Sequence, residues 1–336
     1  MRIKPWLRFF RVPNLPTALG DAAAGASLAF AVLAGEDAHG PPLSGEPLHL
    51  HPGNPLARAV VAAFLASAAA ELLLYLFGLA DNDIAGAKSD ATLAPDRPIP
   101  SGAISLLSAR VARAACLFGA AAVGAAARLP ALWWALAGGL ALLIVLYNRL
   151  KDRLGGVSYL AMGACRGLAL LTGAAAVFEA AGGRLCDDCG GAVWSMALPA
   201  ALAWTVYVFA VTRLSEDEHK AAAPLPAWRY PLGFAALLPA GMAGAKLVCT
   251  APTDTPVLIV CSLAAFCGWC AAVAPLGRPH GPAERGRAVG RAIGALLWMQ
   301  TGLLLLGLHP PFVAFAIALW ALRYAIRALA PGITGS

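Results

Sequence analysis

The sequence predicts an all-α, polytopic membrane protein. Of its 336 residues, 60% are hydrophobic and only 13% are Asp, Glu, Lys or Arg. The mean hydropathy is +0.70, which lies far outside the range of soluble globular domains. Apolar segments of about 20 residues recur along the chain, and each is long enough to cross a bilayer as a helix.

Ten segments qualify as candidate spans within a single domain that covers residues 1–336. Ala and Gly dominate them, which suits close helix packing in lipid. The first segment is preceded by polar and basic residues and is followed by further spans, so we expect no cleavable signal peptide. The candidate ranges are 16–35, 57–80, 103–127, 131–147, 157–178, 193–213, 229–248, 256–275, 290–308 and 312–328.

Basic residues are concentrated in alternate loops, together with the two ends of the chain. This asymmetry predicts that both termini are cytoplasmic, and we expect an integral protein of a bacterial inner membrane. The net charge of +7 is scattered over juxtamembrane loops, so it favours anionic lipid contact and gives no support to nucleic-acid binding. Cys186 and Cys189 form CDDC in a predicted extracytoplasmic loop. A disulfide, a metal site and two unpaired thiols all stay open there, because CxxC alone is a weak signal.

Residues 81–102 are unusually polar and directly follow the second candidate span. Two helical turns from Asn82 would project Asn82, Asp83, Lys88 and Asp90 into one cytoplasmic pocket, with Asp83 and Asp90 within about 20° around the axis. Two carboxylates and an amide can hold Mg²⁺, which commonly bridges carboxylates to phosphate. Arg97 is placed to bind a phosphate oxygen. The alternative is a solvated loop with ordinary capping residues.

Three prolines follow in the same segment. Pro95, Pro98 and Pro100 are expected to hold the loop around Arg97 extended and stiff.

These residues resemble the UbiA superfamily of intramembrane prenyltransferases. The family pattern is N-D-x-x-D-x-x-x-D followed by RP-[IL]-PSG. Asn82, Asp83 and Asp90 match the first part, and the second runs from Arg97 to Gly102 as RPIPSG. Asn14 in RVPNLPT matches an asparagine that the family keeps on its first helix. The resemblance also extends to the helix spacing and covers most of the chain.

The resemblance implies a helical bundle, usually of nine spans, so we expect nine or ten here. It implies a polyprenyl diphosphate bound in a lateral cavity open to lipid. Two Asp-rich motifs, after helices two and six, would coordinate Mg²⁺ against the diphosphate. Ionisation then gives an allylic cation that an aromatic or lipid-like acceptor captures. Metal ions stabilise the leaving charge, and a dry cavity protects the cation.

The chain departs from the family pattern at both motifs. Gly86 stands where the middle aspartate of the first motif belongs. The second motif region, 212–220, keeps only an acidic cluster that includes Glu216 and Asp217, with Lys220 as a point charge that can neutralise phosphate. We expect Asp83, Asp90 and Glu216 to be catalytic, and Asp217 to be a further metal ligand. The degenerate second motif is similar to the EboC-like branch, although a polar inter-helix loop explains it too.

Other polar residues fit the same cavity. Lys151 lies where the family often places a diphosphate-binding lysine, although ordinary positive-inside charge is an equal explanation. Arg166 lies about ten residues into the fifth span, where a charge usually faces the protein interior or a cavity. Glu71, within the second span, needs a partner, and Arg166 is one candidate. Tyr207 is expected either to line the cavity and stabilise a cation or to pack.

The sequence therefore predicts a Mg²⁺-dependent prenyltransferase that acts on a polyprenyl diphosphate. The alternative is a catalytically reduced relative that binds or moves an isoprenoid or lipid-like molecule. A small-solute transporter would need inverted repeats or broken helices, and neither is clear in the sequence.

Overall fold

The computed structural model describes residues 3–36, 54–181, 189–216, 267–268, 270–271, 282–306 and 309–329. The described part is helical and contains no β-strand, which confirms the predicted all-α class. Its elements are α1 (Ile3–Phe9), the 3-10 turn η1 (Val12–Asn14), α2 (Leu15–Glu36), α3 (Pro55–Leu93), α4 (Leu106–Ala126), α5 (Ala131–Leu154), α6 (Gly156–Ala180), α7 (Cys189–Glu216), α10 (Pro282–Leu304) and α11 (Pro310–Leu329).

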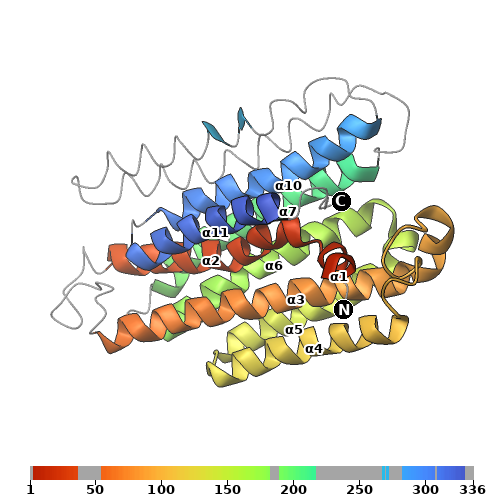
Figure 1. Cartoon of the computed structure of the whole chain (residues 1–336). Coiled ribbons are helices and arrows are strands. Elements are labelled where there is room, and N and C mark those ends of the chain that lie inside the picture. Colours follow the sequence, from red (N-terminus) through yellow and green to blue (C-terminus); the bar gives the residue numbers. More distant parts are fainter. Residues whose placement is uncertain are drawn as a thin grey trace.

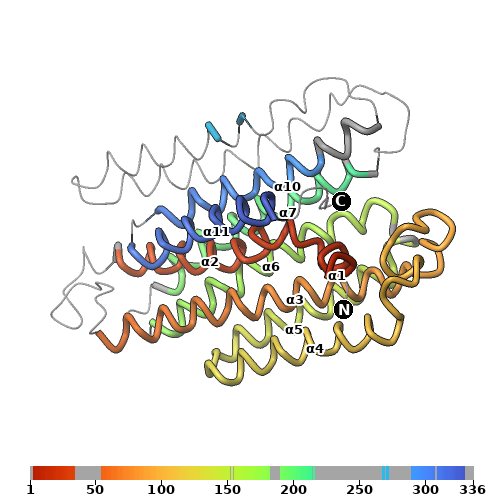
Figure 2. Tube along the Cα trace, viewed as in Figure 1, coloured from red at the N-terminus to blue at the C-terminus, as the bar shows by residue number. Residues whose placement is uncertain are grey.

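The long helices run alongside one another as a bundle (Figure 1). α2 occupies the middle and packs against α3, α6, α7, α10 and α11. α4 packs on α3, while α5 packs on α3 and α6. The tube view follows the same path, with α4 and α5 at one side and α10 and α11 at the other (Figure 2).

Seven helices in the described part are long and apolar enough to cross a membrane. They correspond to the expected spans that begin at 16, 57, 103, 131, 157, 193 and 312. The expected span 290–308 falls largely within α10, which is helical but is not among the seven. The expected span 229–248 lies outside the described residues, as does 256–275 apart from four residues, so a total of nine or ten stays a prediction.

Local sequence explains where α3 and α4 begin. The Asn54 side chain accepts a hydrogen bond from the backbone N–H of Leu56 over 2.9 Å, and Pro55 occupies the first turn of α3. Ser105 caps α4 in the same way, accepting from the N–H of Ser108 over 3.1 Å. Both arrangements are favoured because they provide acceptors for backbone N–H groups in the first turn, which have no partner within the helix.

Glycines bring α2 and α6 into backbone contact. A Cβ atom at Gly25 would overlap the Leu170 carbonyl, and a Cβ at Gly173 would overlap the Ala22 carbonyl. At each of these two glycines the backbone of one helix therefore touches the backbone of the other, as small residues allow in membrane bundles. This close approach explains the abundance of Gly and Ala in these segments.

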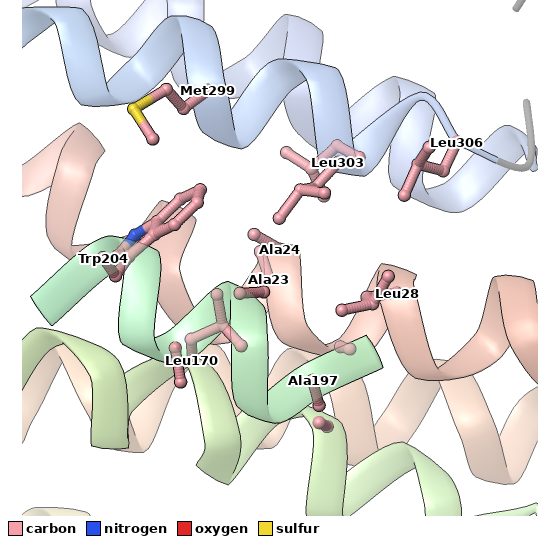
Figure 3. Close-up of a cluster of buried hydrophobic side chains, with 14 of the residues drawn as sticks. Ala23, Ala24, Leu28, Leu170, Ala197, Trp204, Met299, Leu303 and Leu306 are labelled. Carbon is pink, nitrogen blue, oxygen red and sulfur yellow. The ribbon is translucent and has the colours of Figure 1, made fainter. Parts of the chain in front are cut away.

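The main hydrophobic core lies where α2, α6, α7 and α10 meet. Figure 3 shows Trp204 beside Met299, with Leu303 and Leu28 further along the same interface. Trp204 and Leu28 are at most 1% exposed. The core places a dry interior directly alongside the polar residues of α2 and α6.

Candidate functional site

The first predicted motif lies on a continuation of α3. This helix runs for 39 residues, from Pro55 to Leu93, so it extends well past its apolar part. Asn82, Asp83 and Asp90 are therefore helical, as predicted. Asp83 and Asp90 are seven residues apart, which places them about 10 Å apart along the helix axis.

Asp83 is the buried carboxylate of the pair, since the residue is only 7% exposed. Its Oδ1 atom lies 3.3 Å from Nη2 of Arg11. The same oxygen accepts a hydrogen bond from the Asn82 amide, also over 3.3 Å. Asp83 thus has a cationic partner supplied by the N-terminal segment.

Arg11 was not among the predicted site residues. It precedes η1 and adopts a left-handed backbone conformation with φ 41°, which is uncommon for a non-glycine residue. Its position in RVPN, three residues before Asn14, was the one sequence feature that could have marked Arg11 as a site residue. Nothing in the sequence linked Arg11 to Asp83. Only the tertiary structure brings these segments together.

Asp90 pairs with the predicted phosphate-binding arginine. Nη1 of Arg97 donates to Oδ2 of Asp90 over 2.7 Å. The side chain of Arg97 is 43% exposed, and that of Asp90 is 13% exposed. Arg97 thus lies beside the motif with Asp90 as its partner, and its binding of a phosphate oxygen stays a prediction.

The loop that carries Arg97 is not extended, so that prediction was wrong. It forms successive turns, with backbone hydrogen bonds from Ser101 to Arg97 and from Ile104 to Pro98. Proline restricts φ to a value that suits the second position of a β-turn, so the same prolines favour a compact loop. Gly102 has φ 72° and completes the reversal.

Lys151 also reaches the motif. Its Nζ atom donates to Oδ1 of Asn82 over 2.7 Å, which joins α5 to α3. The structure thus brings together two residues that were predicted separately, 69 positions apart. Lys88, another predicted site residue, is exposed on α3.

Gly86 occupies the position between the two aspartates. A Cβ atom built there would lie 3.3 Å from Oδ2 of Asp90 and 3.7 Å from its Cγ. A side chain at this position would therefore point at the Asp90 carboxylate. The missing carboxylate leaves a gap in the middle of the motif face.

Asp81 is a polar anchor that the sequence reasoning missed. It is 1% exposed, and its Oδ1 accepts from Nη1 of Arg113 over 2.9 Å. Its Oδ2 accepts from the Asn148 amide over 3.0 Å, and Arg149 lies 3.9 Å from Oδ1. Asp81 therefore ties α3 to α4 and α5 one residue before the motif begins. The sequence feature that could have revealed Asp81 was an acidic residue directly before Asn82 and Asp83 at the end of a span.

Arg166 faces the protein interior, where it pairs with Asp21 rather than Glu71. Its Nε lies 2.7 Å from Oδ2 of Asp21, and its Nη2 donates to the Thr17 carbonyl over 3.0 Å. Trp204 and Gln300 both donate to Oδ1 of Asp21. This network joins α6, α2, α7 and α10.

Glu71 lies near this network without joining it through a hydrogen bond. Within the described residues, its Oε2 atom is buried and has no hydrogen-bond partner. Arg166 was one candidate partner for Glu71, but the guanidinium forms its ion pair with Asp21. A substrate-binding role for Arg166 stays a prediction.

Asn14 and Tyr207 lie at two further positions in the bundle. The Asn14 side chain is hydrogen-bonded to Tyr75, and the Arg166 guanidinium lies 5.9 Å from the centre of the Tyr75 ring. Tyr207 is fully buried, and its hydroxyl donates to the Ala292 carbonyl over 2.6 Å. Both residues have protein partners, and contacts with a substrate stay a prediction.

The second motif region falls at the edge of the described chain. Glu216 is the last residue of α7, and its side chain is outside the described residues. Asp217 and Lys220 also lie outside them, as does Cys186. Within the described residues, no three His, Cys, Asp or Glu side chains lie close enough together to hold a metal ion.

Comparison with known proteins gives one family and two similar structures. A model of the UbiA prenyltransferase family matches residues 28–289, while no curated protein matches the chain. A structure of digeranylgeranylglyceryl phosphate synthase is similar at 16% identity, covering 94% of this chain and 99% of that one, with a TM-score of 0.46. The apo structure of a UbiA homolog from Aeropyrum pernix K1 is similar at 22% identity, covering 91% and 97%, with a TM-score of 0.39.

Proposed function

Because this chain belongs to the UbiA prenyltransferase family, we propose that it transfers a prenyl group from a polyprenyl diphosphate to an aromatic or lipid-like acceptor in the membrane. The observation that carries the proposal is the grouping at the end of α3. Asp83 and Asp90 lie there with Arg11, Arg97 and Lys151 directly around them. Cations that converge on a carboxylate-bearing helix face are suited to a diphosphate.

The oxygen ligands on this helix face fit Mg²⁺ only if the substrate supplies further ligands. Asp83 and Asp90 are about 10 Å apart along the helix axis, and Gly86 supplies no ligand between them. Mg²⁺ usually keeps several waters and is bound by one or two carboxylates together with substrate phosphates. Each aspartate would supply one carboxylate to a metal held in that manner, because two carboxylates so far apart do not share a single ion. When bound, the metal would neutralise charge on the leaving diphosphate.

The protein's own cations have a defined part in this proposal. Arg11 and Arg97 are held by the two aspartates, so their guanidinium groups are already positioned beside the motif. A diphosphate that enters would compete for these groups and gain bidentate contacts. Lys151 adds a point charge from α5. The apolar bundle excludes water from the prenyl chain.

A second candidate function is favoured by Gly86. Without the middle carboxylate, and with the second motif region keeping one acidic cluster, the chain would bind a diphosphate but ionise it poorly. Such a protein would bind or move an isoprenoid or lipid-like molecule. This function and the transferase proposal make opposite predictions about product.

The test is an assay of the purified chain with radiolabelled geranylgeranyl diphosphate. It is run with and without Mg²⁺ against a panel of aromatic and lipid acceptors, with product identified by mass spectrometry. A Mg²⁺-dependent prenylated product supports the transferase. Tight diphosphate binding without product from any acceptor favours the second candidate. Turnover at the same rate with and without Mg²⁺ contradicts the metal assignment.

A further inference from the structure

A surface pocket of about 490 Å³ lies between α1 and the loop that joins α3 to α4. α1 contributes Lys4 and Arg8 to its lining, and the loop contributes Asp96 and Ser101. Lys4, Arg8 and Asp96 are all exposed. The volume is within the range of small-molecule sites, which are usually about 300–1,000 Å³.

The charges that line this pocket do not neutralise one another. Lys4 and Arg8 are four residues apart, so they lie on the same side of α1. Asp96 lines the opposite wall. Among the ion pairs of the described chain, none includes Lys4, Arg8 or Asp96. Two cations and one carboxylate therefore face a common space with room between them.

Both walls of the pocket continue into the candidate diphosphate site. α1 ends at Phe9, two residues before Arg11, which pairs with Asp83. The loop carries Arg97, which pairs with Asp90. The pocket is separate from that site, because neither arginine is among its lining residues. An occupant would contact the two segments that present these arginines.

The surroundings favour an amphiphile over a free ion. Ile3 lines the pocket and is 68% exposed. Trp6 packs against Phe9 on the same short helix and against Phe10 just after it, with ring centroids 5.6 and 5.9 Å away. Aromatic residues mixed with Lys and Arg are typical of the membrane–water interface, where lipid head groups lie.

We propose that this pocket binds the head group of a phospholipid that combines a phosphate with an ammonium, the chemistry of phosphatidylethanolamine. Lys4 and Arg8 contact the phosphate. Asp96 accepts hydrogen bonds from the ammonium, with the Ser101 hydroxyl as a further acceptor. The acyl chains leave past Ile3. The lipid thereby braces α1 and the loop beside the candidate diphosphate site.

Native mass spectrometry of the full chain in detergent tests this proposal without any need for turnover. Phosphatidylethanolamine, phosphatidylglycerol and phosphatidylcholine are titrated separately, and inorganic phosphate is added as a competitor. We expect phosphatidylethanolamine to bind most tightly and to resist displacement by phosphate. Replacing both Lys4→Ala and Arg8→Ala should weaken its binding about tenfold or more, because each basic group near a lipid surface contributes roughly 1 kcal/mol.

A matched control removes the same charge elsewhere. Arg58→Ala with Arg128→Ala removes two exposed arginines. They lie at the start of α3 and just after α4, at the end of the bundle away from α1 (Figure 1), so lipid binding should be unchanged. Asp96→Asn should lower the preference for phosphatidylethanolamine over phosphatidylcholine while phosphatidylglycerol binding is kept. Equal binding of the three lipids by the wild type, equal loss in both double variants, or displacement by inorganic phosphate would each overturn the proposal.

Discussion

The guanidinium of Arg166 on α6 and the carboxylate of Asp21 on α2 form a 2.7 Å ion pair within the bundle. Their side chains are 13% and 1% exposed, and Trp204 and Gln300 satisfy the second oxygen of Asp21. A charge in the membrane interior is costly unless it is paired. This pair therefore stabilises the contact between α2 and α6.

Replacing Arg166→Gln should destabilise the protein strongly. Removing one partner of a buried pair leaves the other charge uncompensated, and we expect the free energy of unfolding to fall by about 3–5 kcal/mol. Thermal unfolding in detergent measures the change. Arg153→Gln, at an exposed position on α5, is the control. Adding Asp21→Asn should restore part of the loss, and a variant as stable as the control would contradict this role.

Asp81→Ala should loosen the end of α3 that carries the motif. It removes the acceptors used by the half-buried Arg113 and the buried Asn148. Asn148 keeps its hydrogen bond to the Gly78 carbonyl, so we expect a total loss of about 1–3 kcal/mol in the free energy of unfolding. Asp81→Asn keeps one acceptor oxygen, so it should lose less. Unfolding in detergent ranks the two variants, and equal stability of both with the wild type would refute the anchor role.

Asp90→Ala should abolish the Mg²⁺-dependent part of diphosphate binding and leave the fold intact. The variant also frees Arg97 from its 2.7 Å contact, so binding of inorganic pyrophosphate without Mg²⁺ should not weaken. Titration calorimetry at several Mg²⁺ concentrations measures both parts. Glu179→Ala removes a carboxylate near the far end of α6, away from the motif, and should keep the Mg²⁺ response. An unchanged Mg²⁺ response in folded Asp90→Ala protein would defeat the metal assignment.

Gly86→Asp should tighten Mg²⁺-dependent binding of pyrophosphate. The new side chain begins 3.3 Å from Oδ2 of Asp90, so it adds a carboxylate to the gap in the motif face. Gly86→Asn has nearly the same size without the charge and serves as the control. If the protein is a transferase, turnover should rise or survive in Gly86→Asp. Equal affinities of the Asp and Asn variants would rule out a metal site at this position.

Residues 81–102 and 213–228 should both face the cytoplasm, because the Lys and Arg asymmetry orients the chain. Single cysteines at Ser101 and Arg213 should resist an impermeant thiol reagent in intact cells and react after lysis. A cysteine at Arg128, in the turn between α4 and α5, should react from outside. The protein into which these cysteines are introduced should lack accessible native cysteines. Labelling of Ser101→Cys or Arg213→Cys from outside would overturn this orientation.

The sequence by itself determined the class of the protein and the content of its first motif. Apolar segments of sufficient length predict membrane helices because the bilayer leaves the backbone few other ways to satisfy its hydrogen bonds. Asn82, Asp83 and Asp90 were found because a helix repeats every 3.6 residues, so spacing along the chain reports position around the axis. Arg97 was predicted differently, from the proline-rich element RPIPSG that follows the motif in the loop after α3.

The tertiary structure decided which distant residues contact these. Arg11 reaches Asp83 across 72 positions, and Lys151 reaches Asn82 across 69. Arg166 pairs with Asp21 rather than Glu71 because α2 packs closely on α6 through Gly25 and Gly173. Periodicity describes one helix at a time, whereas these contacts depend on the packing between helices. Packing in turn follows from where small residues let two backbones meet.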